Sequence, residues 1–203
     1  MESHLALARQ IACPVALISS AYASAKMPSE TSDSYSDFCD FYDFYMISSI
    51  SYVNLDPLIL STTFLKTSKT GTAALASKQM AVSVLGFQHL DSVMKLESQP
   101  PSEKDPSKAA STLSKIGFNN GRLQSGLLYI KDSLLSLGLQ IFSQSELDQY
   151  IVVMATIKEI APIETTDSAQ NGTTKVEPLI RYNRLYATID QERLSQGNDR
   201  YPV

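Results

Sequence analysis

Hydrophobic residues along this chain fall into short runs that alternate with polar residues or are rich in β-branched side chains. Runs of this kind are typical of β-strands. They predict strands at 14–22, 46–55, 58–65, 80–86, 127–130, 133–145, 149–160, 178–182 and 184–189. Helical spacing is confined to 4–10, 70–79, 88–97 and 107–116. Many short strands with few helices predict a mainly β fold with flanking helices, in the form of a closed or partly closed antiparallel barrel.

The domain organisation follows from this pattern and from the length. The strict alternation of strands and helices that builds a parallel nucleotide-binding sheet is absent from the sequence. A chain of 203 residues can bury one full core. We therefore expect one domain over 1–189, with a loop insertion at 23–44 and a linker at 99–106, followed by a polar tail at 190–203.

Charge and composition argue against several classes of protein. The net charge of -4 provides no basic field for nucleic acid. Two histidines and two cysteines argue against a metal site, and equally against a Ser-His-Asp hydrolase. No apolar run approaches the ~20 residues that span a bilayer. We expect a protein that binds neither nucleic acid nor membrane and is located in the cytoplasm, with the mitochondrion as the alternative.

The densest candidate chemistry is the turn Lys-Thr-Ser-Lys-Thr at 66–70, just before a predicted helix. Its two ammonium groups and three hydroxyls can bind a phosphate, and a helix N-terminus adds unpaired N–H groups and partial positive charge. The alternative is a solvated turn in which Ser68 or Thr70 only caps the helix. Neither a Gly-x-Gly-x-x-Gly nor a P-loop motif is present, so a Rossmann or P-loop site is unsupported.

Several short motifs follow one another in a distinctive order. They are CPVALISS at 13–20, ISS at 47–49, NLDP at 54–57, KTSKT at 66–70, MAVSVL at 80–85, YIKDSLLSLGLQI at 129–141 and EPLIRYNRLYATI at 177–189. This succession resembles the flavin reductase-like, FMN-binding split-barrel family over nearly the whole chain. The resemblance implies an FMN-binding split β-barrel of antiparallel Greek-key type.

The same resemblance implies a function and a set of site residues. Ser48, Ser49 and Ile50 would line the flavin ring, and Lys66, Thr67, Ser68, Lys69 and Thr70 would hold the flavin phosphate. The cofactor would be FMN, with FAD as the alternative, and NAD(P)H would be the co-substrate. The implied activity is hydride transfer from nicotinamide to flavin. A homodimer is implied, together with a partner protein that uses the flavin.

Two departures from the family pattern leave alternative hypotheses about the function. The family's catalytic position is a histidine in a Gly-Asp-His motif, and here the aligned residue is Gln149, which cannot carry charge or move protons near pH 7. Phe44, Tyr45 and Met46 replace the family's Gly-Met-Thr. The main alternative is a non-catalytic flavin-binding structural or assembly protein on the same barrel. Further alternatives are a pyridoxamine-phosphate-oxidase-like enzyme and a barrel that has lost its flavin.

Two further features are interpreted from the residues alone, and a third, Ser83, from the resemblance. The segment DFCDFYDFY at 37–45 is expected to be a loop that packs its rings on the barrel or on a dimer partner, with an aromatic lid or a docking patch as the alternative. His89 is expected to open a helix, exposed or as a cap. Ser83, at a family asparagine position, is expected to be structural.

Overall fold

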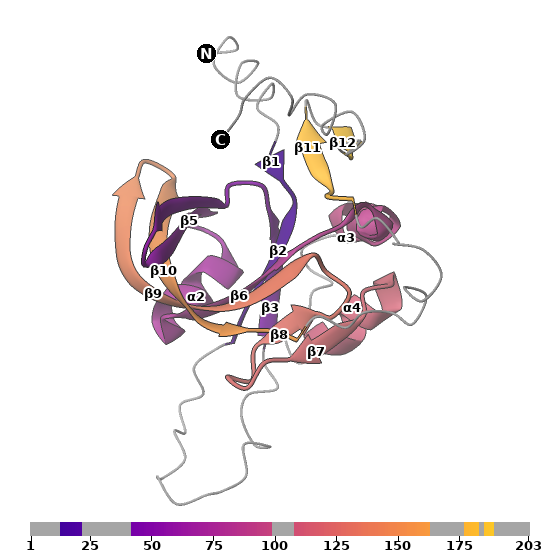
Figure 1. The fold of residues 1–203 in the computed structure, drawn as a ribbon, viewed down its shortest axis with the longest axis horizontal. Coiled ribbons are helices and arrows are strands. Elements are labelled where there is room, and N and C mark those ends of the chain that lie inside the picture. The colour runs from indigo at the N-terminus through magenta and orange to yellow at the C-terminus, as the bar shows by residue number, and fades with distance from the viewer. Residues whose placement is uncertain (1–12, 22–41, 99–107, 163–176, 183–184, 189–203) are drawn as a thin grey trace, which may run out of the picture.

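The computed structural model describes residues 13–21, 42–98, 108–162, 177–182 and 185–188 (Figure 1). Its main feature is a seven-stranded antiparallel sheet in the order β3-β2-β6-β9-β10-β5-β4. The strands of this sheet are β2 (Ala16–Ala21), β3 (Tyr42–Ile47), β4 (Ser51–Leu55), β5 (Leu58–Leu65), β6 (Gln79–Val84), β9 (Leu135–Leu147) and β10 (Tyr150–Ile160). The prediction of a mainly β fold with few helices is confirmed.

The connection between β3 and β4 shows that this sheet is curled into a barrel. β3 and β4 are its two outer strands, yet only residues 48–50 separate them in the chain. In a flat sheet the outer strands would lie roughly 29 Å apart. The chain from Ile47 to Ser51 reaches at most about 14 Å. The two edges must therefore approach each other, which closes the barrel at residues 48–50.

In the described part of the chain, α-helices flank the barrel (Figure 1). They are α2 (Lys69–Ser77), α3 (Leu90–Ser98), preceded by the 3-10 turn η2 (Phe87–His89), and α4 (Ala109–Ile116). None of the helices in the described part of the chain is long and apolar enough to cross a lipid bilayer. Two small sheets complete the structure. One pairs β7 (Asn120–Arg122) with β8 (Leu128–Ile130), and the other contains β1 (Cys13–Pro14), β11 (Ile180–Tyr182) and β12 (Leu185–Ala187).

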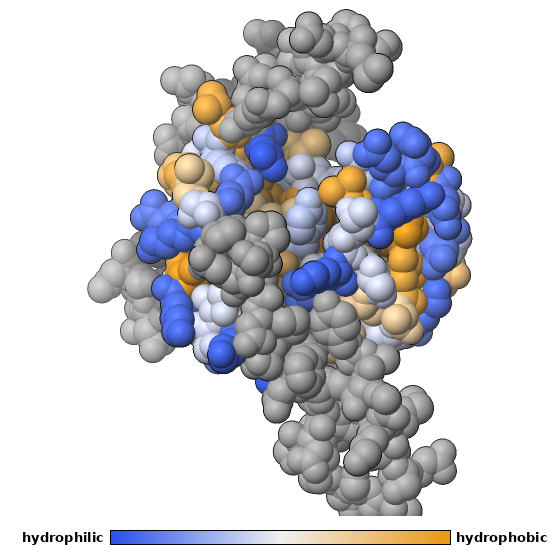
Figure 2. Space-filling view, turned by 180° about the vertical axis from the view of Figure 1, so that it is seen from behind, coloured by the Kyte–Doolittle hydropathy of each residue, from blue (hydrophilic) through white to orange (hydrophobic). Residues whose placement is uncertain are grey.

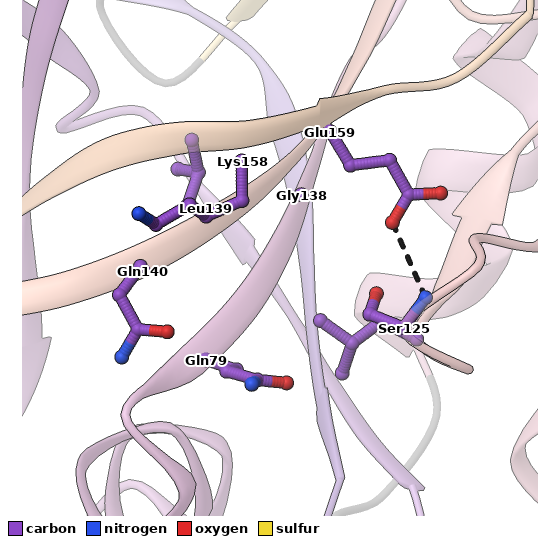
Figure 3. Close-up of a pocket in the computed structure, with 8 residues that line it drawn as sticks. Gln79, Ser125, Gly138, Leu139, Gln140, Lys158 and Glu159 are labelled. Atoms are coloured by element: carbon purple, nitrogen blue, oxygen red, sulfur yellow. Dashed lines mark hydrogen bonds between the residues drawn. The ribbon is translucent and has the colours of Figure 1, made fainter.

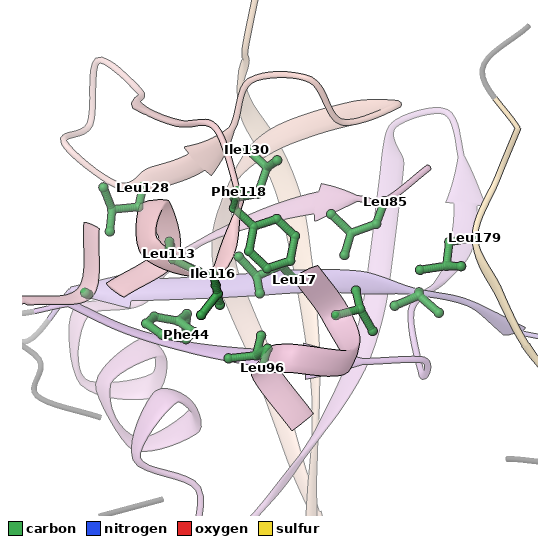
Figure 4. Close-up of a cluster of buried hydrophobic side chains, with 13 residues drawn as sticks. Leu17, Phe44, Leu85, Leu96, Leu113, Ile116, Phe118, Leu128, Ile130 and Leu179 are labelled. Atoms are coloured by element: carbon green, nitrogen blue, oxygen red, sulfur yellow. The ribbon is translucent and has the colours of Figure 1, made fainter. Parts of the chain in front are cut away.

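Two hydrophobic clusters lie on opposite faces of β2, because successive side chains of a strand alternate between faces. Ala16 and Ile18 face the barrel interior, which is filled by residues such as Phe64, Val82 and Val153. Leu17 belongs to the outer cluster, which α3 and α4 cover (Figure 4). The outer cluster also contains Leu113, Ile116 and Phe118. β2 is thus packed against hydrophobic side chains on both of its faces, which holds this part of the barrel wall in place.

Most predicted elements are confirmed, with two corrections. The strand predicted over 46–55 is wrong as one piece, because it divides into β3 and β4 where the barrel closes. The loop predicted over 23–44 ends earlier, since β3 begins at Tyr42 and pairs with β2. β7 was not predicted, because three residues carry no periodicity. The helix predicted at 4–10, the insertion from 23 to 41, the linker at 99–106 and the tail at 190–203 lie outside the described residues.

Candidate functional site

The predicted phosphate turn connects the end of β5 to the start of α2. Ser68 is the N-cap of α2, and its hydroxyl oxygen accepts a hydrogen bond from the N–H of Gly71 at 3.1 Å. The N–H of Ser68 in turn donates to the carbonyl of Leu65 at 2.8 Å. On the other side, the Ser20 hydroxyl donates to the carbonyl of Thr70 at 2.9 Å, which fixes α2 to β2. The capping predicted for Ser68 is confirmed, and the turn is held firmly at both ends.

Several hydrogen-bond donors at this helix start are free to bind an anion. Among the described residues, the backbone N–H groups of Lys69 and Thr70 have no hydrogen-bond partner. The side chains of Thr67 and Lys69 are exposed and unpaired within the same part of the chain. The side chain of Thr70, by contrast, is 2% exposed. Unpaired N–H groups, a cation and a hydroxyl form a donor set that fits a phosphate.

Lys66 is already engaged with the hairpin formed by β9 and β10. Its Nζ lies 2.5 Å from Oε2 of Glu146, and both side chains are substantially exposed. Its backbone N–H donates to the carbonyl of Gln149 at 2.9 Å. The hydrogen bond from Lys66, together with its charge, lowers the pKa of Glu146. Of the two predicted phosphate-binding lysines, only Lys69 is therefore unpaired within the described residues.

The predicted ring-binding segment lies at the barrel closure. The hydroxyl of Ser49 is 3.2 Å from Oγ1 of Thr62 and accepts a hydrogen bond from the N–H of Thr63 at 3.2 Å. Its side chain thus fastens the closure to β5. Ile50 packs against the interior cluster, and Ser48 is half-buried with no hydrogen-bond partner among the described residues.

The ring-binding segment and the phosphate turn are placed along one strand. Ser49 contacts β5 at Thr63, and Lys66 follows three residues later. Three residues of a strand cover about 10 Å. That separation is comparable to the reach of a ribityl phosphate chain. The two predicted halves of the site therefore both adjoin the second half of β5.

Gln149 lies in the tight turn between β9 and β10, after Asp148, which has a φ of 45°. Tyr150 pairs with Leu65, so the turn is adjacent to the start of the phosphate turn. The Gln149 side chain is exposed. Its backbone contact with Lys66 places it at the phosphate end of the arrangement, away from Ser48–Ile50. Its catalytic assignment stays a prediction.

A separate hollow lies on the outer side of the barrel, where Gln79, Gly138 and Glu159 are among the residues that line it (Figure 3). A Cβ added at Gly138 would come within 3.1 Å of Leu123 and Glu159, so the packing at this position is already tight. Glu159 seals one end by accepting hydrogen bonds from the N–H groups of Gln124 and Ser125. None of the predicted site residues lines it. The flavin-site candidate is an open surface of this chain, distinct from the hollow.

Sequence reasoning missed one buried polar pair. His89 is 2% exposed, so the expectation of an exposed side chain is wrong, whereas the capping alternative is confirmed, because its Nδ1 accepts a hydrogen bond from the N–H of Gly86 at 3.2 Å. Its ring stacks on Phe118. Its Nε2 lies 3.2 Å from Oδ1 of Asp132, and neither atom has another partner among the described residues. Burial alone would raise the pKa of Asp132, but the His89 imidazole outweighs it and lowers that pKa. The sequence offered no signal, because the two residues are far apart in the chain.

Comparison with protein families decides the affiliation of the chain. Residues 8–190 match the family described as the flavin reductase like domain. The chain belongs to this family. A search of curated proteins finds no match to this flavin reductase-like protein. Among the described residues, no group of three or more His, Cys, Asp or Glu side chains is placed to hold a metal ion.

Solved structures share the fold of this flavin reductase-like protein. Nitrilotriacetate monooxygenase component B from Mycobacterium thermoresistibile is 16% identical, with a TM-score of 0.68 over 95% of this chain and 88% of that one. The NADH:FAD oxidoreductase of Streptomyces globisporus C-1027 is 13% identical, with a TM-score of 0.66 over 92% of both chains. The styrene monooxygenase flavin reductase of Pseudomonas putida S12 is 11% identical, with a TM-score of 0.64 over 93% of this chain and 97% of that one. These similarities confirm the barrel fold.

Proposed function

We propose that this flavin reductase-like protein binds FMN along β5 and uses NAD(P)H to reduce it. The observation that carries the proposal is the start of α2, where two unpaired backbone N–H groups adjoin the free side chains of Thr67 and Lys69. Membership of the flavin reductase like domain family supports the flavin as the anionic ligand. FAD is the alternative, because the candidate site is an open surface that would leave room for the adenosine part of FAD beyond the phosphate.

The residues of this chain hold and orient the cofactor. Thr67, Ser68 and Lys69 would hold the phosphate with the N–H groups of Lys69 and Thr70, and Ser48 and Ile50 would border the ring. Ser49 keeps the segment closed on β5. When bound, the flavin supplies the redox chemistry, by accepting a hydride from the nicotinamide. Gln149 can donate a hydrogen bond but cannot transfer a proton.

The activity is tested by an anaerobic absorbance titration of the purified protein with FMN, followed by NADH or NADPH. We expect a bound flavin that bleaches on addition of the reduced nicotinamide. A bound flavin that stays oxidised would support the non-catalytic alternative. A protein that binds no flavin would overturn the proposal.

The phosphate assignment is tested by replacing Lys69 with Ala. Loss of an exposed charged donor should weaken FMN binding by about fivefold to tenfold. It should leave the affinity for riboflavin, which lacks the phosphate, unchanged. The double replacement of Lys66 and Lys69 by Ala should weaken FMN further, and unchanged FMN affinity in the double variant would refute the assignment. Lys115→Ala, at an exposed position in the last turn of α4, is the control.

We also propose an oligomeric state, a cellular location and a partner for the protein. We propose one domain over 1–189 that forms a homodimer in the cytoplasm and passes reduced flavin to a partner protein. The structural neighbours from Mycobacterium thermoresistibile and Pseudomonas putida carry the names of a monooxygenase component and of a monooxygenase flavin reductase, which supports such a partner. The transfer of reduced flavin is tested by mixing the purified protein with a flavin-dependent oxygenase and measuring whether the oxygenase becomes active when NAD(P)H and flavin are added.

A further inference from the structure

The hairpin formed by β9 and β10 contacts the C-cap of α2 and the turn that precedes α2. At the C-terminal end, Nζ of Lys78 donates to Oε1 of Gln144 at 3.1 Å. At the N-terminal end, Lys66 contacts Glu146 through its ammonium group and Gln149 through its backbone N–H. Because Gln144 and Glu146 are two residues apart on β9, both side chains point to the same side. The tip of the hairpin thus places one carboxylate beside the phosphate turn.

The carboxylate of Glu146 is paired with Lys66, a lysine that could otherwise bind the phosphate. Lys66 and Lys69 are the two cations of the turn, and Lys66 is paired with Glu146 at 2.5 Å. The negative charge of Glu146 partly offsets the positive charge of Lys66, which weakens the attraction between Lys66 and any other anion. The carboxylate also repels a phosphate directly. We propose that Glu146 sets the affinity of this site by competing with the flavin phosphate for Lys66. The inference rests on the proposed function and adds a residue that the family resemblance does not assign.

The competition has two measurable signatures. It must act on the phosphate alone, so that FMN responds and riboflavin does not. It must also weaken as salt rises, because exposed charges are screened over about 10 Å at 0.1 M ionic strength. Exposed ion pairs are weak, so the expected change in the dissociation constant is at most about fivefold.

The experiment compares Glu146→Gln with Asp148→Asn in the full chain. Asp148 belongs to the same hairpin and is exposed, with no polar side-chain partner among the described residues. Asn tolerates the left-handed backbone of that position, so the control removes one negative charge without strain. Dissociation constants for FMN and for riboflavin are measured by flavin fluorescence at low and at high salt. The same pair is then measured in a Lys66→Met background.

At low salt, Glu146→Gln should bind FMN about threefold to fivefold more tightly than the unmodified protein. Riboflavin affinity should be unchanged, Asp148→Asn should have a smaller effect, and the gain should vanish in the Lys66→Met background. Unchanged or weaker FMN binding by Glu146→Gln would overturn the inference and leave flavin binding standing. An equal gain for riboflavin, or in Asp148→Asn, would overturn it as well. Failure of every variant to bind any flavin would refute the proposed function and this inference together.

Discussion

At the scale of single residues, the pair of His89 and Asp132 is a buried polar contact away from the proposed flavin site. The imidazole is buried beneath Phe118, and its Nδ1 lies 3.2 Å from the backbone of Gly86, where η2 begins. The Asp132 carbonyl also accepts a hydrogen bond from the Gln88 side chain at 2.9 Å. The pair therefore joins the loop between β8 and β9 to the segment before α3.

Replacing Asp132 with Asn should lower the free energy of unfolding by about 1 kcal/mol at neutral pH, after allowance for the partial exposure of the carboxylate. The folded-state pKa of Asp132 lies below its ordinary value of 3.8. The carboxylate therefore stabilises the fold above that value, and this stabilisation is lost as the pH falls through the lower, folded-state pKa. Urea denaturation of both proteins across this range should show their difference shrinking below about pH 4. A difference that is constant with pH, or one equally large for Asp148→Asn, would contradict this account.

At the scale of elements, the position of α2 depends on its close approach to β5. Gly71 lies against Phe64, which is fully buried, and a Cβ at Gly71 would come within 2.8 Å of the Phe64 Cβ. The Lys66–Thr70 turn lies between these two residues in the chain. A shift of α2 would therefore move the N–H groups proposed to bind the phosphate.

Replacing Gly71 with Ala should destabilise the protein, although Ala is the better helix former. The gain in helix propensity is about 1 kcal/mol, and overpacking of a filled core costs about 1–3 kcal/mol. We expect a net loss of up to about 2 kcal/mol in urea denaturation, and weaker FMN binding. Thr72→Ala is the control, because Thr72 is exposed on the same turn of the helix. A Gly71→Ala protein as stable as the unmodified one would show that α2 can move away from β5 without cost.

At the scale of the whole molecule, the sequence predicts local structure well and the closure of the barrel poorly. The strand at 58–65 matches β5, because its run is bounded by Asp56-Pro57 and by the polar turn at 66–70. The 46–55 segment reads as one strand, because its periodicity does not reveal that Ser49 bonds to Thr62 in β5. The phosphate turn was predicted from its own residues, whereas the pairing of Lys66 with Glu146 spans 80 residues and leaves no local pattern. Contacts between residues that only the folded topology brings together are the part of the structure that cannot be predicted from local patterns in a single sequence.

The outer strand β4 carries the last prediction, which concerns the proposed homodimer. All five of its residues are exposed, including Tyr52 at 66%, Val53 at 55% and Leu55 at 72%. An exposed apolar edge strand tends to pair with another chain unless it is covered. Hydrophobic residues also interrupt the hydrophilic surface of the lobe on the right of Figure 2. We expect β4 to be buried between two copies.

Replacing Leu55 with Asp should therefore shift the protein from dimer to monomer, because a charge at the centre of a desolvated contact costs several kcal/mol. Light scattering after size-exclusion chromatography at micromolar concentration measures the mass. Ile160→Asp, at an equally exposed apolar position on β10, is the matched control and should leave the mass unchanged. If the unmodified protein is already a monomer, the homodimer proposal is wrong. The proposed flavin site along β5, the strand next to β4 in the sheet, would then have to bind its ligand without a second chain to cover it.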